Sequence, residues 1–110
     1  MRPLNPHDAG ISLELDRPLM RSSEVLATAL GDREAVMLDI EHGTYFGVEG
    51  VARVIWDALE QPVTPREVVG LLRSRYPDVD PEECERDAME FLEDLVRYRL
   101  VQRYAPPEPA

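Results

Sequence analysis

Lysine is absent from this sequence of 110 residues, cysteine and tryptophan occur once each, and histidine occurs twice. The single thiol, Cys84, excludes an intramolecular disulfide, which suits a reducing compartment. No apolar run approaches the roughly 20 residues that a membrane-spanning helix needs. The N-terminal segment also lacks the apolar stretch of a secretory signal peptide. We therefore expect a cytoplasmic protein that has no membrane partner.

The scarce nucleophilic and metal-binding side chains form no catalytic pattern. His7 lies in the N-terminal segment, His42 in a predicted turn, and Cys84 on the apolar side of a predicted helix. These positions provide no zinc-ligand spacing, and no phosphate-binding glycine loop is present. The sequence thus predicts a protein that is not an enzyme and that carries neither a metal nor another cofactor.

Basic residues are outnumbered, since twelve Arg face 22 Asp and Glu, for a formal net charge of -10. Nucleic-acid binding depends largely on cationic contacts to phosphate, and anionic membranes attract basic segments. The charge argues against both as partners. The apolar fraction of 44% and the length are those of one folded domain.

Three strands are predicted first, over residues 25–30, 34–40 and 44–48. In the second, Val36, Leu38 and Ile40 alternate with Met37 and Asp39, the period of a half-buried strand. The turn after it contains Gly43, which is free to take a positive φ. We expect an antiparallel three-stranded meander.

Three helices are predicted next. The first follows Val48 and ends at Gln61-Pro62, and residues 64–67, Thr-Pro-Arg-Glu, form a capping box for the second. Asp80-Pro81 begins the third by the same logic, and Leu100-Val101 suits one last short strand. This order predicts an α+β fold that resembles a winged helix-turn-helix, with a three-stranded sheet followed by three helices.

The domain organisation follows from these elements. We expect a flexible N-terminal arm over residues 1–22, one folded domain over residues 23–104, and a disordered, Pro-rich tail over residues 105–110.

The third predicted strand has the composition of an unprotected sheet edge. It contains no Lys, Pro or charge, the devices that normally protect such an edge, and Gly47 would let another backbone approach. An extended peptide could add to it as a further strand. Alternatively, the N-terminal arm covers this edge, and the residues alone favour neither interpretation.

The third predicted helix has an apolar arc of about half its circumference, wider than the ~100° stripe that packing on one side requires. Part of the arc either lines a groove or packs against the rest of a small domain. Between Asp78 and Asp94 it carries nine acidic residues and one base, Arg86. This helix is the usual reading helix of a winged helix-turn-helix, and it would face phosphates with the wrong sign.

The run from Glu34 to Val48 resembles the PqqD-like family, the leader-recognition domains of pathways that modify ribosomally made peptides (RiPPs). The resemblance rests on Leu38-Asp39, Gly43, Tyr45-Phe46 and, further on, Ile55-Trp56. It continues in residues 64–69, in Tyr76 with residues 80–83, and in Asp87 followed by Phe91-Leu92 and Leu95. The chain departs from the family pattern at Val48-Glu49, where Leu-Asn is common, and at Arg99-Leu100, where Gly-Leu is common.

The resemblance implies that a precursor's leader peptide pairs with the third strand and lies against the third helix. The partners would be that leader peptide and a modifying enzyme, such as a radical SAM enzyme, a peptidase or a cyclase. Two flanks of the third helix are candidates for the groove. The expected site comprises Thr44, Tyr45, Phe46, Gly47 and Val48, with either Asp87, Phe91 and Asp94 or Met89 and Val96.

Two other functions compete with leader binding. The predicted shape suits a winged-helix transcription regulator, although the sequence contains no sustained basic patch. The acidic surface suits a small protein-interaction module.

Overall fold

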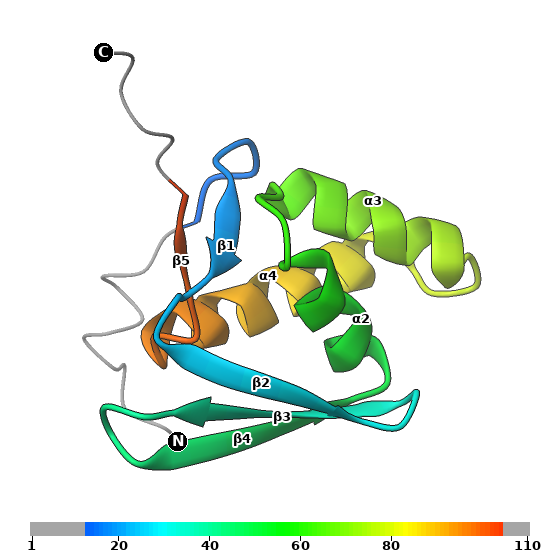
Figure 1. Cartoon of the computed structure of the whole chain (residues 1–110). Coiled ribbons are helices and arrows are strands. Elements are labelled where there is room, and N and C mark those ends of the chain that lie inside the picture. Colours follow the sequence, from blue (N-terminus) through cyan, green and yellow to red (C-terminus); the bar gives the residue numbers. More distant parts are fainter. Residues whose placement is uncertain (1–12, 105–110) are drawn as a thin grey trace, which may run out of the picture.

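The computed structural model describes residues 13–104 of the chain. A meander of three strands forms one layer, and the helices lie on one side of it (Figure 1). The labels used below are those of Figure 1. The elements are β1 (Leu19–Arg21), β2 (Val25–Leu30), β3 (Glu34–Asp39), β4 (Thr44–Glu49), α2 (Val51–Ala58), α3 (Pro65–Arg75), α4 (Pro81–Arg97) and β5 (Val101–Arg103).

The predicted meander is confirmed, with antiparallel strands in the order β2-β3-β4. Gly43, in the turn between β3 and β4, has a φ of 63°, as the sequence indicates. β4 is the last strand of this sheet and pairs only with β3 among the described strands. The position that sequence reasoning gave to the third strand is therefore correct.

The period-two alternation in β3 is present, but the more apolar face is the exposed one. Ala35, Met37 and Asp39 point into the protein, whereas Leu38 is 37% exposed on the opposite face. α2 and the core cover the first face, and nothing in the described residues covers the second (Figure 1). Hydrophobicity alone would have selected the other face.

The predicted helices begin at the caps that the sequence contains. The Thr64 side chain accepts from the Glu67 N–H, and the Glu67 carboxylate accepts from the Thr64 N–H at 3.0 Å, which completes the capping box of α3. The Asp80 side chain accepts from the Glu83 N–H at 3.1 Å at the start of α4. None of the helices in the described part of the chain is long and apolar enough to cross a membrane.

A second, two-stranded sheet pairs β1 with β5. The sequence suggested β5 in part but not β1, which falls inside the arm predicted over residues 1–22. Leu19 is 1% exposed and exchanges two backbone hydrogen bonds with Val63, of 2.7 and 2.9 Å. Residues 19–21 are thus part of the folded body. The remainder of the predicted arm before residue 13, and the tail predicted over residues 105–110, lie outside the described residues.

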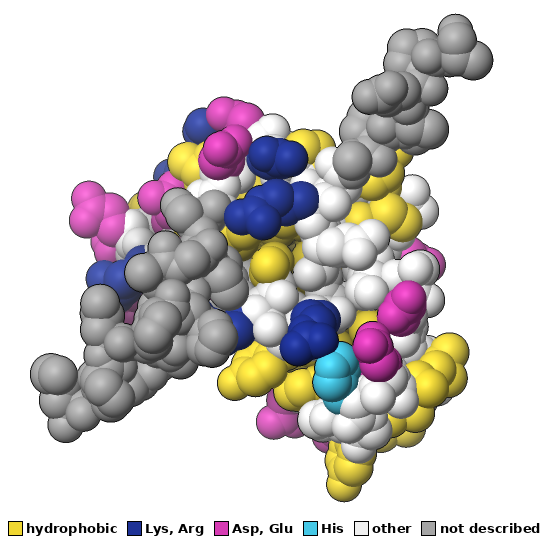
Figure 2. Space-filling model, turned by 90° about the vertical axis from the view of Figure 1, so that its left-hand side faces the viewer, with side chains coloured by type: hydrophobic (Ala, Val, Ile, Leu, Met, Phe, Trp, Pro, Cys, Tyr) yellow, Lys and Arg dark blue, Asp and Glu magenta, His cyan; other side chains and the backbone are white. Residues whose placement is uncertain are grey.

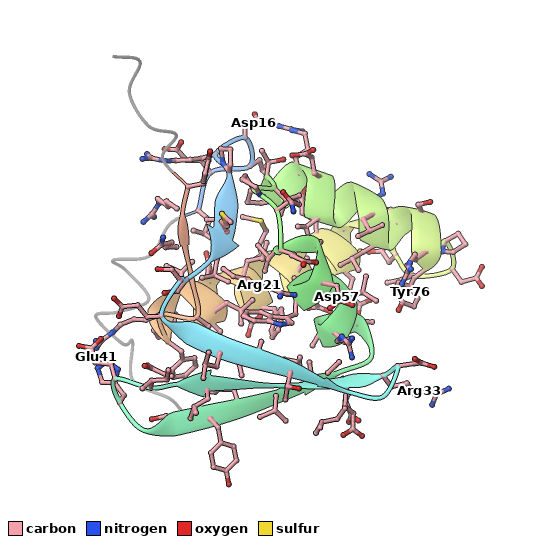
Figure 3. The ribbon with its side chains drawn as sticks, viewed as in Figure 1. Asp16, Arg21, Arg33, Glu41, Asp57 and Tyr76 are labelled. Atoms are coloured by element: carbon pink, nitrogen blue, oxygen red, sulfur yellow. The ribbon has the colours of Figure 1, made fainter. Side chains whose placement is uncertain are left out.

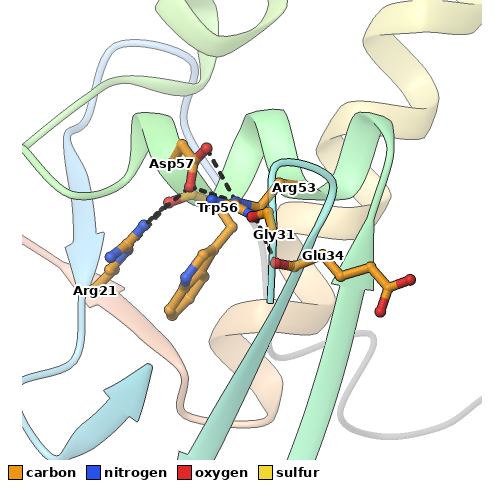
Figure 4. A network of polar contacts seen from close by, with 6 residues as sticks. All are labelled: Arg21, Gly31, Glu34, Arg53, Trp56 and Asp57. Atoms are coloured by element: carbon orange, nitrogen blue, oxygen red, sulfur yellow. Dashed lines mark hydrogen bonds and ion pairs between the residues drawn. The ribbon is translucent and has the colours of Figure 1, made fainter. Parts of the chain in front are cut away.

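α2 joins the two sheets through two arginines (Figure 4). The Arg21 guanidinium lies 4.3 Å from the centroid of the Trp56 ring and donates to the Trp56 carbonyl at 2.7 Å. Burial lowers the pKa of Arg21 from its ordinary value. Arg53 donates to Asp57 in its own helix and to the Glu34 carbonyl at the β2–β3 turn. These contacts hold α2 between β1 and the meander.

Candidate functional site

The outer edge of β4 is available to a further strand within the described part of the chain. Tyr45 and Phe46 point to opposite faces, as their adjacent positions predict. Tyr45 is 75% exposed on the outer face, while Phe46 is half-buried and packs against the core. A Cβ added at Gly47 would meet no atom within 4 Å, so a second backbone has room to approach. Thr44 is exposed and Val48 is buried, at the two ends of this segment.

The flank of α4 that faces β4 is identified by an aromatic contact. The Phe46 and Tyr98 rings lie 5.3 Å apart between centroids, at 40°. Tyr98 follows Phe91 by two helical turns and Asp94 by about one, so these side chains share one flank with Asp87. The structure therefore brings the predicted residues Asp87, Phe91 and Asp94 to the side of β4.

The other candidate flank lies elsewhere. Met89 and Phe91 are two residues apart, about 200° around the helix, so Met89 faces away from β4. Val96, on the flank of Met89, lines a cavity with Val25 and Val101 on the side of the β1–β5 sheet. The structure thus separates Met89 and Val96 from the other site residues. The middle of the broad apolar arc, Cys84, Ala88, Leu92 and Leu95, is core.

An apolar cavity of about 350 Å³ opens at the α2 end of β4. Its walls are the first turn of α2, the end of α3 and the N-terminal half of α4. Tyr76, which Figure 3 shows at the end of α3, contributes to it together with Val51, Asp87 and Phe91. Phe91 belongs both to this cavity and to the flank beside β4, so the two form one continuous surface. A cavity of this size accommodates an aliphatic or aromatic side chain.

A polar network lies at the opposite end of β4, in the β3–β4 turn that contains Glu41 (Figure 3). His42 Nδ1 is 2.8 Å from Asp39 Oδ2, and Arg99 Nη1 is 2.8 Å from His42 Nε2. A guanidinium only donates, so Nε2 is the acceptor and Nδ1 carries the proton that Asp39 accepts. Figure 2 shows this histidine, in cyan, beside a basic side chain.

Asp39 is 7% exposed, and its carboxylate has defined partners. Burial alone would raise the pKa of this carboxyl group, but hydrogen bonds from the side chain and the backbone N–H of His42 outweigh it. The result is a pKa below the ordinary value of an aspartate. The Leu38-Asp39 pair on which the resemblance rests thus provides a charged group that shapes the turn after β3.

The acidic residues of the flank differ in their partners. Asp94 accepts a hydrogen bond from Arg97, one turn further along α4. Asp87 is 3.9 Å from Arg86, and both side chains are more than 60% exposed. An exposed pair at that distance contributes little. Asp87 is therefore the carboxylate best able to meet a basic side chain at the mouth of the apolar cavity.

Sequence reasoning missed Tyr98, Arg99, Val51 and Tyr76 as residues of this region. Tyr98 was detectable from its helical spacing to Phe91, since both lie on one edge of the apolar arc. No local signal identifies Arg99, because its contact with His42 joins positions 57 residues apart.

A comparison with models of known protein families identifies the family of this chain. The model described as coenzyme PQQ synthesis protein D (PqqD) matches residues 34–101, which span more than half of the chain. The chain belongs to the PqqD family. The predicted family membership is confirmed, and the matched residues include all of β3, β4, α2, α3 and α4. No curated protein matches the chain.

Two solved structures of leader-peptide complexes resemble the chain in sequence and fold. TbiB1, in complex with the TbiA(beta) leader peptide, is 36% identical, with a TM-score of 0.70, over 79% of this chain and 99% of that one. A lasso peptide synthetase B1, complexed with its leader peptide, is 25% identical, with a TM-score of 0.66, over 76% and 96%.

A third solved structure shares the fold at lower identity. It is the PqqD part of Methylobacterium extorquens PqqCD, described as a stand-alone RiPP recognition element. It is 19% identical, with a TM-score of 0.65, over 84% of this chain and 96% of that one. The α+β fold predicted for the chain is that of these PqqD-like structures.

Proposed function

We propose that this chain is a non-catalytic chaperone that binds the leader of a ribosomally made precursor peptide and presents it to a modifying enzyme. One observation carries the proposal: the open edge of β4 lies beside the α4 flank of Asp87, Phe91 and Tyr98. An extended leader would pair with β4 by backbone hydrogen bonds and direct every second side chain toward that flank. The leader peptides in the complexes of TbiB1 and the lasso synthetase B1 protein support this function.

Side-chain burial would supply most of the affinity. Ordering an extended peptide costs roughly 1–2 kcal/mol per residue in backbone entropy, whereas each strand hydrogen bond contributes only about 0.5–1.5 kcal/mol net. A buried aliphatic or aromatic side chain contributes about 1.5–3 kcal/mol. The apolar cavity beside Phe91 would receive such a side chain, and Asp87 would meet a basic residue next to it.

Presentation rather than chemistry would be the contribution of this protein. Holding the leader converts the encounter between core peptide and enzyme into a tethered one, with an effective concentration set by the intervening peptide. We place this work in the cytoplasm, where precursor peptides are made. The similarity to a lasso peptide synthetase B1 protein favours a lasso-type pathway, with a peptidase or a cyclase as the enzyme, over a radical SAM enzyme.

The edge of β4 is tested by two substitutions at one position. Gly47→Pro removes a backbone donor and adds bulk, whereas Gly47→Thr keeps the donor and extends into open space on the outer face. Calorimetry with the synthetic leader of the accompanying precursor should show binding to wild type and Gly47→Thr but not to Gly47→Pro. Circular dichroism establishes that both variants are folded.

Amide hydrogen exchange gives a second measurement, which uses the wild-type protein and needs no substitution. On addition of the leader, alternate N–H groups of β4 should become protected, while those on the outer edge of β2 should not. A folded Gly47→Pro variant with normal affinity, together with unchanged exchange in β4, would mean that the leader binds elsewhere.

A further inference from the structure

The outer face of the meander is unusually apolar for a surface. Leu26, Leu38 and Tyr45 face one another across the three strands and are 60%, 37% and 75% exposed. Thr28, Val36 and Gly47 form the next row of the same face. All of these except Gly47 line a shallow depression of about 580 Å³. Figure 2 shows hydrophobic side chains on the surface at the lower end of the molecule, where Figure 1 shows the three-stranded sheet.

This apolar face packs against no other element of the described chain, and apart from Tyr45 and Gly47 its residues lie outside the proposed leader site. It is turned away from α2 and the core, and its central residues belong to β2 and β3 rather than to the open edge of β4 (Figure 1). Contiguous apolar surface of this kind marks a protein interface. In β3, Val36 and Leu38 lie on this exposed side, whereas Ala35, Met37 and Asp39 point inward, so apolar side chains are placed where the fold does not bury them.

Acidic side chains adjoin the apolar rows. Glu34 and Glu49 are directly opposite each other at one end of the same face. Neither has an ion-pair partner among the described residues, and like charges in this position oppose strand pairing. Arg33, in the β2–β3 turn, is the only Arg or Lys between Val25 and Glu49. The face thus has an apolar centre with an acidic border at one end.

The acidic border indicates which kind of protein is complementary to this face. A second copy of this chain would bring Glu34 and Glu49 toward another acidic border, on a molecule that also carries a net charge of -10. A protein with an apolar patch bordered by Arg or Lys is complementary in both respects.

We propose that the outer face of the β2-β3-β4 sheet docks the modifying enzyme, through an apolar patch of that enzyme bordered by basic residues. The identity of this partner rests on the proposed function. A leader strand added to β4 would extend the same sheet beyond Tyr45, so the docked enzyme would lie against both the chaperone and its peptide. Leader and enzyme would then bind without competing for one surface.

The decisive variant is Leu26→Thr combined with Leu38→Thr. Both side chains are exposed, threonine suits a strand, and neither position lies on β4. The matched control is Leu71→Gln, since Leu71 is 38% exposed on α3 and thus resembles Leu38 in exposure. Biolayer interferometry measures binding to the purified modifying enzyme of the same pathway, and calorimetry measures binding to the synthetic leader.

The double variant should bind the enzyme at least tenfold more weakly than wild type and should bind the leader within twofold of wild type. Leu71→Gln should match wild type in both assays. The proposal is overturned if wild type does not bind the enzyme, if the double variant binds it normally, or if leader affinity falls in parallel. It is also overturned if sedimentation shows a wild-type dimer that the double variant converts to monomer, because a second copy then occupies the face. If wild type binds the enzyme through this face but not the leader, the proposed function fails and the docking surface stands.

Discussion

At the scale of single residues, Arg99 combines a strained backbone conformation with a side-chain contact to a residue that is distant in the sequence. It has a φ of 63°, the left-handed region that glycine adopts without strain. It lies in a Schellman ending, in which the Leu100 N–H donates to the Leu95 carbonyl and the Arg99 N–H to that of Val96. Glycine is common at this position in the family pattern that the sequence resembles. Arginine instead supplies the guanidinium that contacts His42 and joins the end of α4 to the β3–β4 turn.

Two substitutions at Arg99 separate the effect of the backbone strain from the effect of the contact with His42. Arg99→Ala removes the guanidinium and retains the left-handed backbone, whereas Arg99→Gly removes both the contact and the strain. Because that conformation costs a non-glycine residue about 1–2 kcal/mol, the glycine variant should be about 1 kcal/mol more stable than the alanine variant. Urea unfolding measures the difference. An alanine variant as stable as the glycine variant would contradict the assignment of strain.

Asp39 leads to a prediction about pH. Its pKa in the folded protein lies below the ordinary value of 3.8, so the ionised carboxylate stabilises the fold. This contribution is fully present above the unfolded-state pKa and is lost as the pH falls through the folded-state pKa. Asp39→Asn should therefore be less stable than wild type near neutral pH, and the difference should shrink in strong acid.

Chemical denaturation across that pH range provides the measurement. In a His42→Ala background the effect of Asp39→Asn should be smaller, because the main hydrogen-bond donor is gone. A difference between wild type and Asp39→Asn that stays constant into strong acid would exclude the carboxylate charge as its source.

At the scale of elements, α4 has three roles around its circumference. Its middle stripe is core, and its two half-buried flanks face different parts of the protein. The flank of Phe91 adjoins β4 and the apolar cavity, while the flank of Met89 and Val96 faces the side of the β1–β5 sheet. The apolar arc is thus broad because both of its flanks pack against other parts of the protein. The flank of Phe91 also adjoins the open edge of β4.

The two flanks predict different effects on leader binding. Phe91→Ala should weaken binding about tenfold or more, because a buried aromatic contact is worth about 1.5–3 kcal/mol. Met89→Ala is a matched control, since both side chains are half-buried on the same helix, and it should stay within about twofold of wild type. Calorimetry with the synthetic leader on folded protein provides the comparison. Equal losses would place the groove across the whole helix instead of along one flank.

At the scale of the whole molecule, charge and fold point to different partners. The arrangement of strands and helices resembles a winged helix-turn-helix, but α4 carries seven acidic residues and only two arginines. A helix of that charge repels phosphate, so no observation favours a transcription regulator. The charge instead suits a protein whose proposed partners, a leader peptide and a modifying enzyme, carry basic residues.

Salt distinguishes an apolar groove from an acidic surface as the site of leader binding. If side-chain burial dominates, raising the ionic strength should weaken leader binding only mildly, apart from any basic leader residue that meets Asp87 or Asp94. Calorimetry at low and high salt, combined with an alanine scan of the leader, provides the measurement. Neutral apolar leader positions and an affinity that collapses with salt would place the leader on the acidic face.

The sequence by itself determined the three strands of the meander and the three helices, because the signals that define them are local. The capping groups of Thr64 and Asp80, the glycine of the β3–β4 turn and the alternating strands act within a few residues. The ordered motifs from Leu38-Asp39 to Ile55-Trp56 were sufficient to identify the family. They were also sufficient to place β4 at the end of the meander.

Only the tertiary structure decided how distant segments meet. The pairing of β1 with β5 joins Leu19 to Arg103, and the contact of His42 with Arg99 joins a turn to a helix end. The choice between the flanks of Phe91 and Met89, and the exposed position of Leu38, likewise depend on where α2 and β4 pack. Periodicity specifies that a strand or helix has two sides. Which side becomes interior is settled by the neighbours that cover it, and these come from remote parts of the chain.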